Sequence, residues 1–434
     1  MKKLSLLFGL VAVSGFSTTF ALTPAYEYEK VALVLDKWFS NVSIPGEYMT
    51  RDVRRKFTED DFDLTNIPTF NVDHEHGVHT NWLHHTFPNE IFKDVANVRK
   101  AKHAIAKLLW RGLSKVKDSA GRLLGAAGIR DNDVENYLIA ISRIVQAYED
   151  FFEQIENTFS IGEQMITNPR DVEYGPETNF WSKFRPFISC HHQKRLGPEV
   201  GGSKIWCNPD YLEEASNEGA TRRYVLSAGS GGDFSYEEYL TKTFSNLVIV
   251  TPDCTTFEEQ KWSINEAMNS STVMLPVCLT GEDGRYTTHV HPSLRPKFIR
   301  FEDLCKGLNN FFGESFYFTA LKVNIEGFEY PLFADVFKNE EKLLKGTKQI
   351  HIELHRQGMQ RWGLNWNSLV LGELLIAHFY SGGFIPFAAE KWHDSTAASD
   401  IAFVNSTWFM ISENLAKNKR IYEVHKQFVD EMYL

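Results

Sequence analysis

The sequence predicts an α/β fold in which a mostly parallel sheet ends in an antiparallel hairpin and follows a mostly helical region. From Arg222 onward, continuous apolar runs alternate with segments of helical period, which is typical of parallel strands covered on both faces. The last two apolar runs are separated by residues 388–399, where no helical period is found. These two runs are therefore expected to pair with each other in antiparallel fashion.

Strands and helices are expected to alternate along this part of the chain. The expected strands are residues 223–228, 247–251, 272–279, 316–325, 349–354, 383–387 and 400–405. The expected helices lie near residues 234–243, 301–310, 329–337 and 367–380. We accordingly divide the chain into a signal peptide (1–21), an N-terminal mostly helical region (22–180) and an α/β domain (181–434).

Two stretches of the N-terminal region carry its helical prediction. Between Val134 and Ile155, apolar residues recur at spacings of three and four, which predicts a helix with one buried face. A weaker pattern of the same kind extends from Phe92 to Leu109. The glycine-containing segment from Gly121 to Gly128 is expected to form the turn between the two helices.

The first residues have the pattern of a secretory signal peptide. Lys2 and Lys3 precede an apolar run from Leu4 to about Phe16, and a segment of small residues then ends at Ala21. The run is short for a membrane span, and no other segment has roughly 18 consecutive apolar residues. We expect a soluble mature chain in the secretory lumen or outside the cell, with an uncleaved N-terminal anchor as the alternative.

Charge and sequons narrow the class of protein further. The formal net charge is −10 and there is no long basic run, which argues against nucleic acid as a partner. Acceptor sequons for N-glycosylation begin at Asn41, Asn269 and Asn405, as expected for a glycoprotein of the secretory pathway. The sequence does not indicate an oligomeric state.

The cysteines predict disulfides in an oxidising compartment. Cys190 and Cys207 flank a glycine-containing loop, and closing it stabilises the fold by ~3 kcal/mol on the chain-entropy model. Cys254 and Cys278 are expected to form a second bridge, whereas Cys305 has the spacing of a buried helical thiol.

A histidine-rich segment at residues 73–85 contains the side-chain types of a zinc site. A polar loop is the preferred interpretation of this segment, because its spacing matches no defined metal motif and the sequence has no close pair of cysteines. We therefore predict no metal site.

A glycine-rich turn is the most informative motif of the chain. Gly229, Ser230, Gly231 and Asp233 follow an apolar strand, and Asp253 follows the next strand. Glycines let the backbone approach a ligand closely, and an acid at the end of the second strand accepts hydrogen bonds from ribose hydroxyls. These residues are therefore the candidate cofactor-binding residues.

The turn lacks one element of a dinucleotide site. The dinucleotide fingerprint needs a third glycine at position 234, where this chain has Phe234. A nucleoside without a pyrophosphate fits better, and S-adenosylmethionine is the commonest ligand of that kind. An ordinary loop and a nicotinamide-dependent oxidoreductase are the alternatives.

Two later motifs resemble a known family. Leu321-Lys322-x-x-x-Glu326-Gly327-x-Glu329, followed by Ile350-x-Ile352-Glu353-x-His355, is similar to the FkbM-type methyltransferases, particularly to their eukaryotic secreted or lumenal branch. The resemblance covers about residues 180–408. It implies a Rossmann-like class I methyltransferase sheet, S-adenosylmethionine as cofactor, and O-methylation of a sugar, a glycan or another secretory-pathway metabolite.

The candidate catalytic residues are Glu326, His355 and Lys322, at the ends of the fourth and fifth expected strands. Glu326 is expected over the cleft, and His355 is expected to orient or deprotonate an acceptor hydroxyl. The alternatives are a packing role for His355 and a buried ion pair for Lys322.

One position departs from the family pattern. Asn324 stands where the family usually has Asp, and an amide has no basic carboxylate. A protein that retains the fold as a binding or scaffold module, without turnover, is therefore the alternative function.

Overall fold

A computed structural model describes the chain from residue 95 to residue 415 with gaps. The described residues are 95–126, 131–167, 186–198, 202–210, 212, 223–244, 246–253, 271–275, 277–280, 297–312, 317–325, 328–339, 341–355, 366–391 and 398–415. The expected signal peptide, the histidine-rich segment, Glu326 and the sequons at Asn41 and Asn269 lie outside them.

The main sheet confirms the α/β prediction. Its strand order is β5 (Thr272–Leu275), β4 (Leu247–Pro252), β3 (Arg223–Ala228), β8 (Phe318–Val323), β9 (Gln349–His355), β11 (Ala398–Asn405) and β10 (Phe384–Lys391). Neighbouring strands are parallel except at β11, which is antiparallel to both β9 and β10. The expected closing hairpin is therefore present.

The chain leaves β3 in one direction to build β4 and β5, and later returns to the other side of β3 to build β8 and β9. This reversal is a topological switch point, and open α/β sheets bind ligands beside such a point at the carboxyl ends of the strands. The turn after β3 and the ends of β8 and β9 are therefore expected to share a site.

The structure corrects the expected strand 272–279. Thr272–Leu275 forms β5 at the edge of the main sheet, whereas β6 (Val277–Thr280) pairs with β7 (Lys297–Arg300) in a separate parallel sheet. Pro276 lies between the two in the sequence and has no N–H for a strand ladder, which explains why one apolar run gives two strands.

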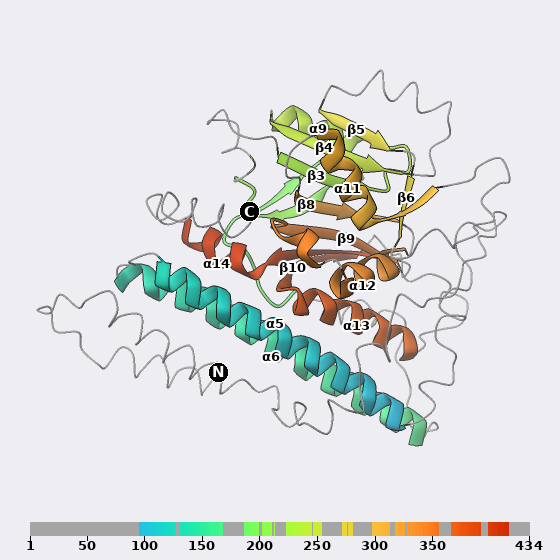
Figure 1. The fold of residues 1–434 in the computed structure, drawn as a ribbon. Helices are drawn as coiled ribbons and strands as arrows, with labels where there is room; N and C mark the ends of the chain where they lie inside the picture. The colour runs from blue at the N-terminus through green and yellow to red at the C-terminus, as the bar shows by residue number, and fades with distance from the viewer. Residues whose placement is uncertain are drawn as a thin grey trace, which may run out of the picture.

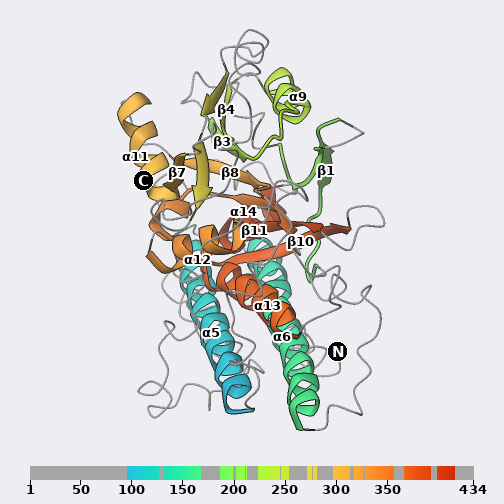
Figure 2. The same cartoon turned by 90° about the vertical axis from the view of Figure 1, so that its right-hand side faces the viewer.

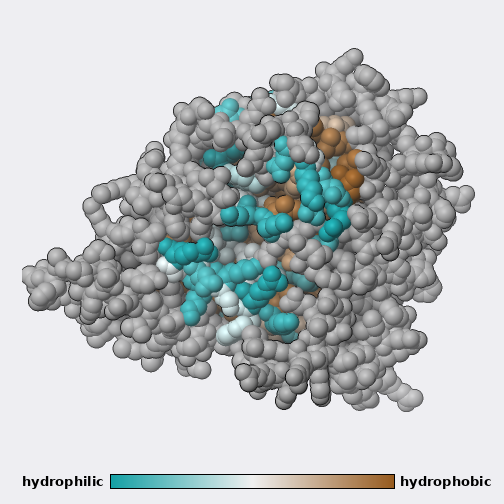
Figure 3. All heavy atoms as spheres, viewed as in Figure 1, coloured by the Kyte–Doolittle hydropathy of each residue, from teal (hydrophilic) through white to brown (hydrophobic). Residues whose placement is uncertain are grey.

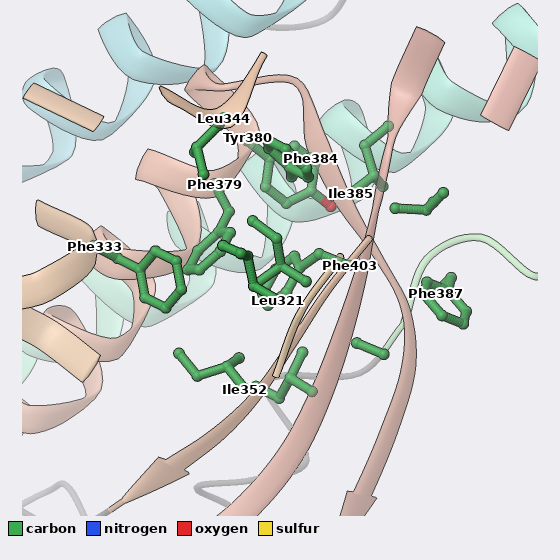
Figure 4. Close-up of a cluster of buried hydrophobic side chains, with 14 of the residues drawn as sticks. Leu321, Phe333, Leu344, Ile352, Phe379, Tyr380, Phe384, Ile385, Phe387 and Phe403 are labelled. Atoms are coloured by element: carbon green, nitrogen blue, oxygen red, sulfur yellow. The ribbon is translucent and has the colours of Figure 1, made fainter. Parts of the chain in front are cut away.

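One face of the main sheet is apolar. Helices α11 (Phe301–Phe312), α12 (Glu329–Asn339) and α13 (Trp366–Ser381) lie near the expected ranges. Phe379 of α13 stacks on Phe403 of β11 with ring centroids 4.1 Å apart, and Phe333 of α12 lies 4.7 Å from Phe379 (Figure 4). Burial of these aromatic side chains fixes α12 and α13 against the sheet.

The opposite face carries polar side chains. Alternation along the paired strands places Ser227, Lys322, His351, Glu353 and Asp400 on this face. Helix α9 (Ser235–Thr243) and a short antiparallel ribbon of β1 (Gln193–Leu196) and β2 (Lys204–Cys207) cover it. Figure 2 shows β1 and α11 on opposite sides of the sheet.

The N-terminal helices pack on the α/β part. Helices α5 (Val95–Ala126) and α6 (Asp131–Thr167) lie side by side and contact α13 and α14 (Ser406–Leu415) (Figure 1). Their buried side chains join the same hydrophobic cluster as the sheet. The expected turn from Gly121 begins later, because α5 continues to Ala126 and Leu123 is fully buried.

The outward side of α5 is hydrophilic. Ser114, Asp118 and Arg122 are exposed there, and hydrophilic residues make up much of the described surface on this side (Figure 3). Among the helices that the structure describes, none combines the length and apolar character needed to cross a membrane.

Gly112 allows the closest approach of α5 to α13. A Cβ atom at Gly112 would lie 2.0 Å from the Tyr380 carbonyl oxygen and 2.5 Å from the Tyr148 hydroxyl. We expect Gly112→Ala to lower the free energy of unfolding by about 1–3 kcal/mol, because the backbone of α13 must move.

Gly121→Ala is the matched control for this variant. A Cβ there meets nothing within 4 Å, so the same change in the same helix is expected to stabilise the protein by up to about 1 kcal/mol. Equal unfolding midpoints of the two variants in urea would contradict the assigned contact.

Helix α14 follows β11 directly and was not expected. The Asn405 side-chain oxygen accepts hydrogen bonds from the N–H groups of Thr407 and Trp408, at 3.0 and 3.2 Å, and so caps the helix. The third sequon thus contributes a helix cap in the folded chain.

The cysteines follow the prediction where they are described. Cys190 and Cys207 form a disulfide with their Cα atoms 5.5 Å apart. Cys278 is also disulfide-bonded, and its expected partner, Cys254, lies outside the described residues. Cys305 is buried in α11 and is not part of a disulfide, as expected.

Candidate functional site

The glycine-rich turn forms a tight loop between β3 and α9. Gly229, Gly231 and Gly232 have φ angles of 75°, 59° and 85°, which favour glycine. A Cβ at Gly229 would lie 1.6 Å from the carbonyl oxygen of Asn324, whereas a Cβ at Gly231 meets nothing within 4 Å. The backbone at Asn324 therefore leaves room only for glycine at position 229. Gly231 faces open space where a ligand can approach.

Asp253 fixes this loop from the end of β4. Its Oδ2 accepts hydrogen bonds from the N–H of Ser230 at 2.7 Å, the N–H of Gly231 at 2.8 Å and the Ser230 hydroxyl at 2.9 Å. Asp253 is 4% exposed. Because Asp253 occupies two loop N–H groups, the loop cannot offer them to a pyrophosphate.

Lys322 fixes the same loop from β8. Its Nζ donates a hydrogen bond to the Gly229 carbonyl oxygen at 2.5 Å, and its side chain is buried. Burial lowers the pKa of Lys322, while the charge of Glu237 raises it. Glu237 is buried in α9, accepts a hydrogen bond from the Ser227 hydroxyl, and has its pKa raised by burial.

Asp233 has a different position from the other loop residues. It is exposed, and its Oδ1 accepts a hydrogen bond from the Ser235 N–H at 3.0 Å, where α9 begins. That hydrogen bond lowers the pKa of Asp233 and keeps the carboxyl ionised. Asp233 therefore stabilises the first turn of α9.

A second polar cluster lies at the carboxyl ends of β8 and β9, and we call it the acceptor cluster. It consists of Asn324, Glu329, Glu353 and His355. The Asn324 amide donates a hydrogen bond to Glu353 at 2.8 Å, and His355 Nδ1 lies 2.9 Å from Glu329 Oε1. Its position beside the glycine-rich turn follows from the pairing of β3 with β8.

Glu329 links His355 to the backbone after β8. Its Oε1 also accepts the Ile325 N–H at 2.9 Å, and Glu329 is fully buried at the start of α12. The contact between Glu329 and His355 turns Nδ1 of His355 toward Glu329 and the other ring nitrogen, Nε2, toward Glu353. Nε2 lies 3.6 Å from Glu353 Oε1.

Burial, followed by the charge of Asp400, raises the pKa of Glu353. The charges of His355 and Lys204 lower the pKa of Glu353. Two oxygen atoms of the cluster, Asn324 Oδ1 and Glu329 Oε2, are buried and have no hydrogen-bond partner among the described residues. Both are acceptors, so a group that enters the cluster must donate hydrogen bonds.

The structure brings together most of the residues chosen from sequence. Asp253 and Lys322 both form hydrogen bonds with the glycine-rich turn. His355 lies at the end of β9, which pairs with the strand that carries Lys322. Lys322 donates its hydrogen bond to the glycine-rich turn and interacts with Glu353 of the acceptor cluster only through its charge, which favours a positioning role. Glu326 is outside the described residues, and its catalytic role stays a prediction.

Sequence reasoning did not select Glu329, Glu353 and Lys204 as site residues. Glu329 and Glu353 were within the two family-like motifs, so the motifs themselves contained this signal. Lys204 was part of the cysteine-flanked segment, and no local pattern indicates that it reaches Asp400 of β11.

A family model described as a methyltransferase domain matches residues 146–405 of the chain. The chain belongs to this family. The match extends from within α6 to the end of β11 and so contains the whole main sheet. The strand order of this methyltransferase domain is that of a Rossmann-like class I sheet. The FkbM-type branch stays a prediction.

The comparison of solved structures gives a weak likeness to a Methanococcus jannaschii fibrillarin pre-rRNA processing protein. The TM-score is 0.28 at 9% sequence identity, over 50% of this chain and 84% of the archaeal one. A likeness at this level does not bear on the function of the methyltransferase domain. No curated protein matches the chain significantly.

The residues of the methyltransferase domain fit a nucleoside cofactor. The open space at Gly231 admits a ligand, and the loop N–H groups held by Asp253 leave no phosphate cradle. Among the described residues, no three His, Cys, Asp or Glu side chains are placed to hold a metal ion.

Proposed function

We propose that the chain is an S-adenosylmethionine-dependent methyltransferase that methylates a hydroxyl group of a small molecule or glycan of the secretory pathway. Membership of a methyltransferase-domain family supports the reaction class. The glycine-rich turn with Gly229, Ser230, Gly231, Asp233 and Asp253 supports the cofactor, which supplies an activated methyl group when bound.

The observation that carries the choice of acceptor is the pair of unpartnered acceptor atoms, Asn324 Oδ1 and Glu329 Oε2. A hydroxyl group donates a hydrogen bond to such an atom, whereas a carboxylate or phosphate cannot. His355 Nε2 then takes the hydroxyl proton while Glu329 holds the ring at Nδ1. The protein's remaining task is to position the acceptor and exclude water.

A binding or scaffold protein without turnover is the second candidate, favoured by Asn324 at the family's usual Asp position. The Asn324 amide has a contact that an Asp carboxylate cannot make, because it donates a hydrogen bond to Glu353. This contact supports retained chemistry at the position and weakens the argument for a lost base.

The test is transfer of labelled methyl from S-adenosylmethionine to a panel of methyl glycosides and glycans released from secreted glycoproteins. We expect a product stable to mild base, as a methyl ether is, and formation of S-adenosylhomocysteine. In the matched variant Asp253→Ala, calorimetry should show S-adenosylmethionine binding weakened by about tenfold or more, because the loop loses a charged acceptor.

Two results would count against the proposal. Binding of S-adenosylmethionine without transfer to any acceptor would favour the scaffold alternative. Failure of the folded wild-type chain to bind S-adenosylmethionine would refute the cofactor assignment.

A further inference from the structure

The β1–β2 ribbon places a lysine beside the acceptor cluster. Lys204 of β2 lies with its Nζ 2.6 Å from Asp400 Oδ1 of β11, and Lys204 is 6% exposed. Lys204 and Asp400 are 196 residues apart in sequence. Their contact therefore joins a segment outside the main sheet to the polar face of that sheet.

Several contacts fix the ribbon against the sheet and so hold Lys204 in place. The N–H of Cys207 donates to Gln349 Oε1 at 2.8 Å, and Gln349 Nε2 donates to the Cys207 carbonyl at 2.7 Å. The Trp206 ring lies 4.7 Å from the His351 ring, and Arg195 forms an ion pair with Glu390. The Cys190–Cys207 disulfide closes the base of the ribbon.

Asp400 connects Lys204 to the acceptor cluster. In the β11–β9 register Asp400 is paired directly with Glu353, on the same face of the sheet. Glu353 in turn accepts the hydrogen bond from Asn324 and faces His355 Nε2. Among the described residues, the charged and titratable groups that act on Glu353 are Lys204, Lys322, Glu329, His355 and Asp400.

We propose that Lys204 is a positioning residue of the acceptor cluster, an inference that rests on the proposed function. Its ammonium neutralises Asp400 and thereby keeps Glu353 as the ionised acceptor that orients Asn324 beside His355. Without Lys204, two carboxylates face each other across β9 and β11 in a buried site, and one of them must take up a proton.

The same conclusion follows from the energetics of buried ion pairs. Removing two charges from water costs about as much as their mutual attraction returns, so a buried pair adds little net stability over an apolar pair. A role limited to stability would therefore be filled equally well by apolar residues. The neighbouring Glu353, which needs a compensating charge, explains why a lysine is buried here.

The test uses three variants of the full chain: Lys204→Met, Lys204→Arg, and the double variant Lys204→Met with Asp400→Asn. Carbon-13 carboxyl NMR of glutamate-labelled protein, with Glu353→Gln for assignment, follows the titration of Glu353. We expect this titration to move to higher pH in Lys204→Met. It should return close to the wild-type position in Lys204→Arg and in the double variant, in which both charges are gone.

Turnover is measured on the same proteins with the acceptor found in the glycan panel. The kcat of Lys204→Met should fall by at least about tenfold at neutral pH, and the double variant should regain most of it. The affinity for S-adenosylmethionine, measured by calorimetry, should stay within about twofold in all three, because other residues hold the glycine-rich turn.

An unchanged Glu353 titration in folded Lys204→Met would overturn the proposal, and so would a double variant that remains as impaired as the single one. If the NMR shifts appear as expected but no acceptor is methylated by any form, the proposed function fails and the coupling of Lys204 to Glu353 stands.

Discussion

Replacing His355 with glutamine is expected to lower kcat by about 10²–10⁴-fold, because the variant lacks the group that takes the acceptor proton. Glutamine retains a side-chain amide near Glu329, so packing at the end of β9 changes little. The affinity for S-adenosylmethionine should remain within about twofold, since His355 is not part of the glycine-rich turn.

The variant Glu329→Gln is the matched control for His355→Gln. A glutamine oxygen can still accept from the N–H of Ile325 and from His355 Nδ1, but it no longer stabilises a protonated ring. We expect roughly a tenfold loss in kcat, smaller than that of His355→Gln. A pH–rate profile with an unchanged rising limb in His355→Gln would show that another group is the base.

Asn324→Asp is expected to impair the protein and not to restore a family-like base. The new carboxylate replaces an amide that donates to Glu353 at 2.8 Å, so two acids meet in a buried cluster. Their repulsion adds to the burial and the Asp400 charge that already raise the pKa of Glu353. We expect kcat at neutral pH to fall by about tenfold or more, because ionisation of the pair distorts the cluster.

The same variant should have a distinctive dependence of stability on pH. A carboxyl whose pKa is higher in the folded than in the unfolded state binds more protons when folded, so its stabilising contribution is lost as pH rises through the folded pKa. The melting temperature of Asn324→Asp should therefore fall, relative to wild type, between weakly acidic and neutral pH. A constant difference across that range, or a gain in turnover, would contradict the assigned Asn324–Glu353 contact.

Sequence periodicity predicted the main sheet apart from the end of β5. Buried parallel strands are continuous apolar runs: β4 and β8 are buried along their whole lengths, and β3 is buried at every residue after the first. The ribbon was missed because β1 is a four-residue strand of which three residues are exposed, a pattern that resembles a loop. Helix α14 was missed because its cap, Asn405, is also the last residue of β11.

The candidate site also has a part that the sequence predicts and a part that it does not. The glycine-rich turn and Asp253 could be predicted because a local turn needs glycines and a strand end presents an acid. The pairs Asn324–Glu353 and Lys204–Asp400 could not, because each depends on the register between strands that are distant in sequence. Residue types alone do not reveal which acid an amide or a lysine will reach.

The β1–β2 ribbon is closed by a disulfide between residues that are close together in the sequence. Cys190 and Cys207 are separated by only 17 residues, and both precede Gln349 and Asp400 in the chain. The small loop can therefore close while the strands that will receive it have not yet left the ribosome. In a reducing compartment the segment that carries Lys204 would lose this covalent closure and would depend on its contacts with Gln349, His351 and Asp400 alone. Competence at the acceptor end would then depend on where the chain matures, in addition to the residues it contains.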